Sequence, residues 1–373
     1  MDDRVKYAIG AVAVLGLILA IVILLQQEEL PDIPPPAPPD VPVPNPPMPE
    51  APEQLGNTSC YAVIPGHNEP DHERVNVVFV GFEMDQDAFV SLLPLFVDYN
   101  GTGLTTQVEE NQKITSEGET DVFTENRTFT FRGLLGIEPF KSNRDKFNFW
   151  YVDEIQNVSI AAKFSNRNAT AAATRTDNYC ESDIAQSCGL ANTYPIHICN
   201  VTGRSFGSWI RNKAYIGSVY FFPKPGGTIW QREGAFNPYI IRTIVHEFGH
   251  SFGGLMDEYT MADGSASPGE PNCAPDLETA QQWWGDLVGQ GEGDMEIGYF
   301  EGCSYALDNI RPTNKSLMRI TSSPIYDFGI VNEQHLQQLL DQYSGLYMEN
   351  IVDVDPVPPP RNQTDNQTYE EKR

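Results

Sequence analysis

The sequence predicts an α+β domain with an α/β-like N-terminal sheet. Two observations predict this class. Short apolar runs rich in valine and aromatic residues occur early in the central part of the chain, and stretches with helical spacing of apolar residues occur later. The chain has 373 residues, and its two ends differ in composition from the middle, so one globular unit is predicted at 57–350.

Four runs in this unit are predicted to be strands. VNVVFVGF at 75–82 is a continuous apolar run of the kind that forms a buried strand, and aromatic and polar residues alternate over 147–155. A weaker run at 127–134 and the apolar run at 214–222, which ends before PKPGG, are predicted to be the other two.

Helices are predicted to follow these strands. The first has Asn237 as its N-cap and a proline in its first turn, and its apolar residues keep helical spacing up to a stop signal at Gly253 and Gly254. Two further helices are predicted near 276–289 and 332–348. The order of strands first and helices later supports the α+β class.

The N-terminal end, residues 1–26, is predicted to be a short cytoplasmic segment and a single transmembrane anchor. Residues 7–25 are 19 residues without a charge, enough to cross a bilayer as a helix. Basic residues precede this run and acidic residues follow it, so the N-terminus is predicted to be cytoplasmic and the rest extracellular, at the cell membrane. A cleaved signal peptide is the alternative, but the run is long for one and no small-residue cleavage site follows it.

Two further segments are predicted to lie outside the globular unit. Residues 27–56 form an extracellular linker dominated by proline, which favours an extended polyproline conformation over a helix or a sheet. Residues 351–373 form a polar, proline-bearing tail that is predicted to be disordered.

Cysteines and glycosylation motifs agree with an extracellular location. All six cysteines follow the predicted anchor, which suggests up to three disulfides. Two pairings are plausible: Cys273 with Cys303, and two of Cys180, Cys188 and Cys199 with each other. Free buried thiols are the alternative. Nine Asn-X-Ser/Thr motifs, about three times the chance number, indicate N-linked glycans; they begin at Asn57, Asn100, Asn126, Asn157, Asn168, Asn200, Asn314, Asn362 and Asn366.

The charge of the chain excludes one class of partner. With 51 acidic against 24 basic residues, the net charge is −27, and the sequence has no basic patch that could neutralise the phosphates of a nucleic acid. We therefore expect no nucleic-acid partner and a well-hydrated surface.

One motif predicts a metal site. His246 and His250 are four residues apart inside the predicted helix, so both imidazoles lie on one face about one turn apart and can share a cation. Glu247 lies beside them. Two histidines and an intervening glutamate at this spacing, HExxH, are the two ligands and the general base of a zinc hydrolase. Zn²⁺ is the predicted cofactor.

The third ligand is predicted to be a carboxylate just after this helix. Met256 stands where an extended motif would place a ligand, and a thioether is a poor ligand for zinc. In a continuous helix Asp257 would lie about 10 Å beyond His250 along the axis, so the helix must end at the glycine pair for a carboxylate to return. We expect Asp257 as the ligand, with Glu258 as the alternative, and the other residue orienting a ligand histidine. Two histidines, one carboxylate and an open position are typical of catalytic zinc.

HEFGHSFGGLMDEY resembles the active-site signature of the metallopeptidase family named after bacterial immunoglobulin A peptidases, a branch of the metzincin-like zincins. Stretches at 75–82, 138–154 and 299–319 are also similar to that family. The resemblance implies a zincin catalytic domain with His246 and His250 as zinc ligands, Glu247 as base and a third ligand in the DEY segment. It also implies that Met318 forms a methionine turn below the metal. The chain departs from the family after this methionine, where YDFGIVNEQHL replaces a cysteine-bearing stretch.

These observations predict a membrane-anchored extracellular zinc metallo-endopeptidase. Its substrate would be an extracellular or cell-surface polypeptide, hydrolysed by a zinc-activated water with Glu247 as general base. Two alternatives remain open: a catalytically inactive zincin-like surface glycoprotein with a binding or structural role, and a zinc amidase that acts on a non-peptide amide of the cell envelope.

Overall fold

The computed structural model describes residues 53–65, 68, 73–116, 119–158, 180–200, 204–217, 238–260, 267–319 and 327–343. They all belong to the second of two compact units, Glu50–Arg373. No helix in these ranges is long and apolar enough to cross a membrane. The anchor predicted at 7–25, most of the linker and the C-terminal tail lie outside the described residues.

A six-stranded sheet organises the fold, in the order β1-β5-β2-β6-β8-β7. The four inner strands β5, β2, β6 and β8 run parallel, and β1 and β7 pair antiparallel with their neighbours at the two edges. The strands of this sheet are β1 (Cys60–Ala62), β2 (Val75–Phe82), β5 (Phe147–Val152), β6 (Thr193–Cys199), β7 (Phe206–Ser208) and β8 (Lys213–Gly217).

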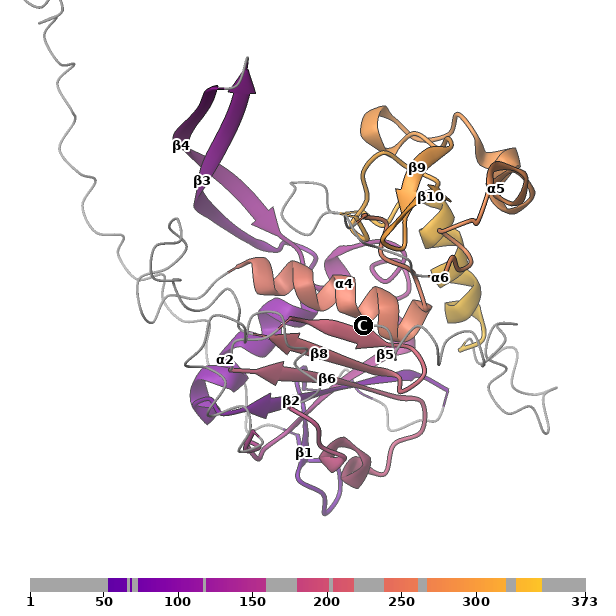
Figure 1. Ribbon diagram of the computed structural model, residues 1–373. Helices are drawn as coiled ribbons and strands as arrows, with labels where there is room; N and C mark the ends of the chain where they lie inside the picture. Colours follow the sequence, from indigo (N-terminus) through magenta and orange to yellow (C-terminus); the bar gives the residue numbers. More distant parts are fainter. Residues whose placement is uncertain are drawn as a thin grey trace, which may run out of the picture. The chain divides into compact units, whose positions relative to one another are not determined.

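The central strand β2 is buried on both faces because alternate side chains enter two different cores. Val77 and Phe79 belong to the larger core, together with apolar side chains of the helices α2 (Gln86–Val97) and α4 (Tyr239–Gly253). Figure 1 shows α4 lying along the sheet next to β8. This packing holds the helix that carries the histidine pair against a parallel sheet.

Two disulfides cover the opposite face of the sheet. Val78 and Val80 pack there in a second core that contains both bridges. Cys180–Cys199 joins two members of the predicted trio, as expected, and the third member bonds to β1 as Cys60–Cys188. Three disulfides in the structure are compatible with an extracellular protein.

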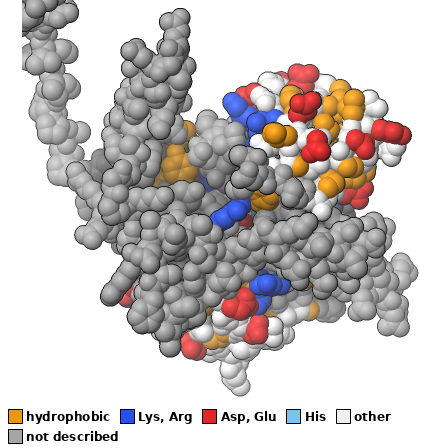
Figure 2. Space-filling view, viewed as in Figure 1, with side chains coloured by type: hydrophobic (Ala, Val, Ile, Leu, Met, Phe, Trp, Pro, Cys, Tyr) orange, Lys and Arg blue, Asp and Glu red, His pale blue; other side chains and the backbone are white. Residues whose placement is uncertain are grey.

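The remaining elements connect or extend this core. The strands β3 (Leu104–Ser116) and β4 (Glu119–Phe131) form a separate hairpin, and α5 (Leu277–Trp284), β9 (Phe300–Cys303), β10 (Ala306–Arg311) and α6 (Ile330–Asp341) follow α4. Short 3₁₀ turns lie at Leu134–Gly136, Arg144–Lys146, Ile184–Cys188, Gly285–Leu287 and Gly293–Met295. Figure 2 shows acidic side chains scattered over the part of the surface that carries α5, β9 and β10.

The structure is mixed α+β, in agreement with the predicted class. The strand predicted at 127–134 ends earlier, at Phe131, because the backbone at Gly133 packs so closely on the last turn of α2 that a Cβ there would overlap the carbonyl oxygens of Leu95 and Phe96. The strand predicted at 147–155 ends at Val152, before two exposed acidic residues. Residues 218–222 and 344–348, the ends of a predicted strand and a predicted helix, lie outside the described residues.

Candidate metal centre

The histidine pair lies on α4, a helix whose side chains are nearly all buried. The helix ends as the glycine pair predicts. Gly254 has a φ of 61°, in the left-handed region that favours glycine, and its N–H bonds to the His250 carbonyl oxygen at 2.9 Å. The chain therefore leaves the helix axis at once, and residues 255–258 pass back beside the two imidazoles.

Two backbone carbonyls fix the tautomers of both histidines. The Nδ1 atom of His246 lies 3.0 Å from the Leu317 carbonyl oxygen, and Nδ1 of His250 lies 2.5 Å from the Leu255 carbonyl oxygen. A carbonyl oxygen only accepts hydrogen bonds, so each Nδ1 carries the proton and donates it. Each Nε2 is then left with a lone pair that points into the site.

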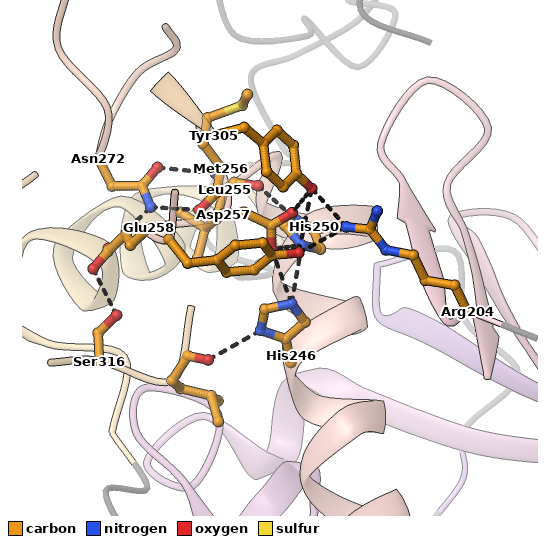
Figure 3. A network of polar contacts seen from close by, with 12 residues as sticks. Arg204, His246, His250, Leu255, Met256, Asp257, Glu258, Asn272, Tyr305 and Ser316 are labelled. Carbon is orange, nitrogen blue, oxygen red and sulfur yellow. Dashed lines mark hydrogen bonds and ion pairs between the residues drawn. The ribbon is translucent and has the colours of Figure 1, made fainter. Parts of the chain in front are cut away.

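Three potential ligand atoms converge at this point (Figure 3). Oδ1 of Asp257 lies 3.2 Å from Nε2 of His246 and 3.1 Å from Nε2 of His250, and the two Nε2 atoms are 3.2 Å apart. Ligands about 2.0–2.1 Å from a tetrahedral zinc are about 3.3–3.4 Å from each other, so this triangle has the size that zinc requires. Three lone pairs this close repel one another unless a cation lies between them.

The electrostatics of the site also favour a positive charge. All three side chains are buried, with exposed fractions of 5% for His246, 7% for His250 and 1% for Asp257. Burial by itself lowers the pKa of His246, but the carboxylates of Asp257 and Glu247 outweigh burial and raise it above the ordinary value. The site thus stabilises a cation next to Nε2, whether a proton or a metal ion.

The structure separates the two carboxylates that the sequence left as alternatives. Asp257 faces the histidines, whereas the Glu258 side chain turns away and is fully buried. Oε1 of Glu258 accepts from the amides of Asn272 at 3.0 Å and Asn332 at 2.9 Å, and Oε2 accepts from the Ser316 hydroxyl at 2.6 Å. The sequence predicted that the carboxylate that is not the ligand orients a ligand histidine, but the hydrogen bonds of the Glu258 carboxylate go to Asn272, Asn332 and Ser316. Glu258 joins three separate segments around the site instead.

Glu247 is the other acidic residue of the site. It is buried, and its carboxylate oxygen lies within 4.8 Å of the ligand atoms of both histidines in a group that could hold a metal ion. Oδ1 of Asp257 lies 3.1–3.2 Å from the two Nε2 atoms, so the carboxylates of both Asp257 and Glu247 lie near the histidine pair. The backbone of β7 lies against the same turn of α4, since a Cβ on Gly207 would overlap the Glu247 carbonyl oxygen.

Met318 lies beneath the helix at the site. It is fully buried, and its Sδ is 3.0 Å from where a Cβ on Gly249 would be. The preceding residue, Leu317, supplies the carbonyl that holds His246. The segment that the sequence suggested as a methionine turn is thus in direct contact with α4 between the two histidines.

Three residues of the site were not predicted from the sequence. The hydroxyl of Tyr305 donates to Oδ2 of Asp257, and Arg204 donates to the hydroxyls of both Tyr259 and Tyr305 (Figure 3). Arg204 and Tyr305 are separated by 101 positions in the sequence, so no motif spacing relates them. Tyr259 is the last residue of the DEY segment, and this position was the one signal in the sequence that could have pointed to it.

A pocket of about 570 Å³ lies away from this site, between α5 and α6. Trp283 lines it, whereas its neighbour Trp284 is fully buried and donates from Nε1 to the Gly298 carbonyl oxygen. One member of the tryptophan pair is therefore a core anchor. None of the potential metal ligands borders this pocket, so the donor set, and not this pocket, identifies the site.

No family model matches the chain, and a search of curated proteins finds no match either. The function proposed below therefore depends on the geometry and chemistry of the site.

Proposed function

We propose that the protein is a zinc metallo-endopeptidase of the metzincin-like zincin type, with the resemblance to immunoglobulin A peptidases noted above. The observation that carries the proposal is the convergence of His246 Nε2, His250 Nε2 and Asp257 Oδ1 at 3.1–3.2 Å beside the Glu247 carboxylate. These three residues would hold the zinc ion. When bound, zinc would polarise the carbonyl group of the substrate and lower the pKa of a water molecule.

The chain's own residues supply the proton transfers. Glu247 would accept the proton of the attacking water and donate it to the leaving amine, the two steps of amide hydrolysis that need a general base and a general acid, and its position within 4.8 Å of the histidine ligand atoms supports this role. The Leu317 and Leu255 carbonyls keep both imidazoles oriented with Nε2 towards the site. Burial of the ligands limits access of bulk water from the helix side.

The proposed substrate is a polypeptide, because a general base beside a site that could hold zinc is the arrangement that hydrolyses an amide bond. The strand β7 packs on α4 at Glu247 and His250, so it lies beside the potential metal ligands.

The extracellular, membrane-anchored location remains part of the proposal. Among the motifs whose asparagine side chain is described, Asn57, Asn100 and Asn157 are exposed and Asn200 and Asn314 are half-buried, so none of these five is fully buried. The disulfides support an oxidising compartment. The anchor is proposed from the sequence of residues 7–25 alone.

Two measurements on the purified extracellular part test the proposal. Metal analysis should find one zinc per chain. Incubation with an unbiased peptide library should give cleavage by the wild type, and Glu247→Gln should lose about 100- to 10,000-fold in rate while it keeps its zinc. Zinc without peptide cleavage by either protein favours an amidase on another substrate or an inactive surface glycoprotein. Equal cleavage by both proteins would rule out Glu247 as the base.

A further inference from the structure

The second oxygen of Asp257 has a hydrogen-bond donor of its own. Oδ1 faces the two histidines, and Oδ2 accepts from the hydroxyl of Tyr305. Both side chains are almost fully buried, at 1% for Asp257 and 5% for Tyr305. Because water reaches neither group freely, the Tyr305 hydroxyl strongly influences which way the carboxylate is turned.

The backbone holds Tyr305 in an unusual conformation to make this contact. Its φ is 65°, in the left-handed region that is unfavourable for a residue other than glycine. Two backbone hydrogen bonds fix it there: Ser304 donates to the Asp257 carbonyl oxygen at 2.7 Å, and Tyr305 donates to the Tyr259 carbonyl oxygen at 2.9 Å. The disulfide Cys273–Cys303 anchors the residue just before this turn. The turn thus carries the Tyr305 ring together with the segment that contains Asp257.

Arg204 determines the direction of the tyrosine proton. One guanidinium nitrogen, Nη2, lies 2.9 Å from the Tyr305 hydroxyl and 2.8 Å from the Tyr259 hydroxyl. Arginine has donors and no acceptor, so both hydroxyl oxygens accept from it and the Tyr305 proton must point elsewhere. Two acceptors are within its reach, the Tyr259 hydroxyl at 3.3 Å and Oδ2 of Asp257, and the carboxylate oxygen is the nearer and the charged one, so it accepts the proton.

We propose that Tyr305 and Arg204 are positioning residues for the metal centre, which keep Asp257 turned so that only Oδ1 faces the ligand cluster. This inference rests on the proposed function, because it assumes that Asp257 is a metal ligand. Arg204 lies just before β7, whereas Tyr305 lies between β9 and β10. The contact therefore joins the segment before β7 to the segment that holds the proposed third ligand (Figure 3).

The alternative is that these hydrogen bonds only stabilise the fold. Removal of a buried hydrogen bond then lowers the melting temperature and leaves metal binding unchanged. A positioning role predicts a loss of metal affinity, because partners of metal ligands contribute about 10- to 100-fold. The two roles therefore differ in a quantity that can be measured without substrate.

Three single variants of the full chain separate these roles. Tyr305→Phe removes the hydroxyl that contacts Asp257 and keeps the ring. Arg204→Gln removes the guanidinium from a partly exposed position, so it tests the same contact even if Tyr305→Phe fails to fold. Tyr194→Phe is the matched control, because its hydroxyl makes a 3.0 Å hydrogen bond to the Tyr343 hydroxyl in the core and none to the ligands.

Zinc affinity is measured by competition with a chelator, and coordination by the visible spectrum of the Co²⁺-substituted protein. We expect Tyr305→Phe to weaken zinc binding about 10- to 100-fold and to change the Co²⁺ spectrum. Arg204→Gln should weaken zinc binding and change the spectrum to a smaller extent. Tyr194→Phe should lower the melting temperature and leave zinc binding and the spectrum unchanged. The inference is overturned if Tyr305→Phe binds zinc with wild-type affinity and has an unchanged Co²⁺ spectrum. If only Arg204→Gln folds, the same result in that variant overturns it. In either case the proposed function still stands. If the wild type binds neither metal, both proposals fail.

Discussion

At the scale of single residues, Asp257 and Glu258 are adjacent in the chain and their carboxylates point in opposite directions. Asp257 contacts the two histidines and Tyr305, whereas Glu258 accepts hydrogen bonds from Asn272, Asn332 and Ser316. Burial raises the pKa of Glu258, and the donors around it oppose that rise. One carboxylate thus belongs to the proposed metal centre and the other to the scaffold around it.

This division predicts different losses for two isosteric substitutions. Asp257→Asn should weaken zinc binding by more than the 10- to 100-fold typical of residues that only contact a ligand, because an amide is a weaker metal ligand than a carboxylate. Glu258→Gln should keep zinc affinity within a few-fold and lower the free energy of unfolding by about 1–3 kcal/mol, because one of its acceptor oxygens becomes a donor. Chelator competition and urea unfolding measure the two effects.

Each variant is the control for the other, since both change one oxygen to nitrogen at neighbouring buried positions. If Glu258→Gln lost zinc and Asp257→Asn kept it, the assignment of the third ligand would be reversed. Comparable zinc loss in both would mean that the 255–258 segment acts as a unit and not through Asp257.

At the scale of elements, the helix α6 contains a carboxyl group whose charge is unfavourable in the folded state. Burial, Asp327 and Glu138 together raise the pKa of Glu333 from an ordinary 4.5 to about 7, although the Gly329 N–H donates to it. The folded state therefore binds the proton of the Glu333 carboxyl group more tightly than the unfolded chain does. The resulting stabilisation is complete below about pH 4.5 and is lost as the pH rises through about 7.

We predict that Glu333→Gln removes this pH dependence. The free energy of unfolding of the wild type, relative to the variant, should fall by at most about 3 kcal/mol between pH 4.5 and pH 8, with partial exposure of the side chain reducing the effect. Urea unfolding of both proteins at several pH values measures the difference. A wild type that gained stability over the variant as the pH rose would show that the Glu333 pKa is lowered and not raised.

At the scale of the whole molecule, the sequence predicted those features that are determined by residues close together in the chain, such as the bounds of a buried strand and the end of a helix. β2 has the predicted bounds of 75–82 because a continuous apolar run leaves little choice. The end of α4 follows from Gly253 and Gly254, and the return of the chain to Asp257 follows from that end. The strand β6 was missed because Pro195 and His197 interrupt its apolar pattern, although both are buried in the sheet.

Contacts between distant parts of the chain could not be predicted in this way. Tyr305 is 48 positions from Asp257, and Arg204 is 55 positions from Tyr259. Their side chains meet because the sheet places the segment before β7 beside the turn between β9 and β10. The partner of Cys60 was also left open, because its bridge closes 128 positions. Cys273–Cys303, which closes 30, was predicted.

The two disulfides last named lie at different distances from the proposed metal centre and should have different effects when removed. Cys60–Cys188 lies in the core on the face of the sheet opposite α4, whereas Cys273–Cys303 packs with Met256 directly beside the Asp257 segment. In the chain-entropy account, loops of 128 and 30 residues contribute about 5 and about 3.5 kcal/mol respectively. The disulfide that closes the longer loop should therefore contribute more to the free energy of unfolding, and the one that closes the shorter loop should contribute more to zinc affinity.

We predict that replacing Cys60 and Cys188 together by alanine causes the larger fall in the free energy of unfolding and leaves zinc affinity unchanged. Replacing Cys273 and Cys303 should cost less stability but weaken zinc binding, because Cys303 precedes the turn that holds Tyr305 and Ser304 against Asp257. Urea unfolding and chelator competition on the two double variants give both quantities. Zinc affinity that fell equally in both variants would show that the metal centre responds to global stability and not to the turn beside it.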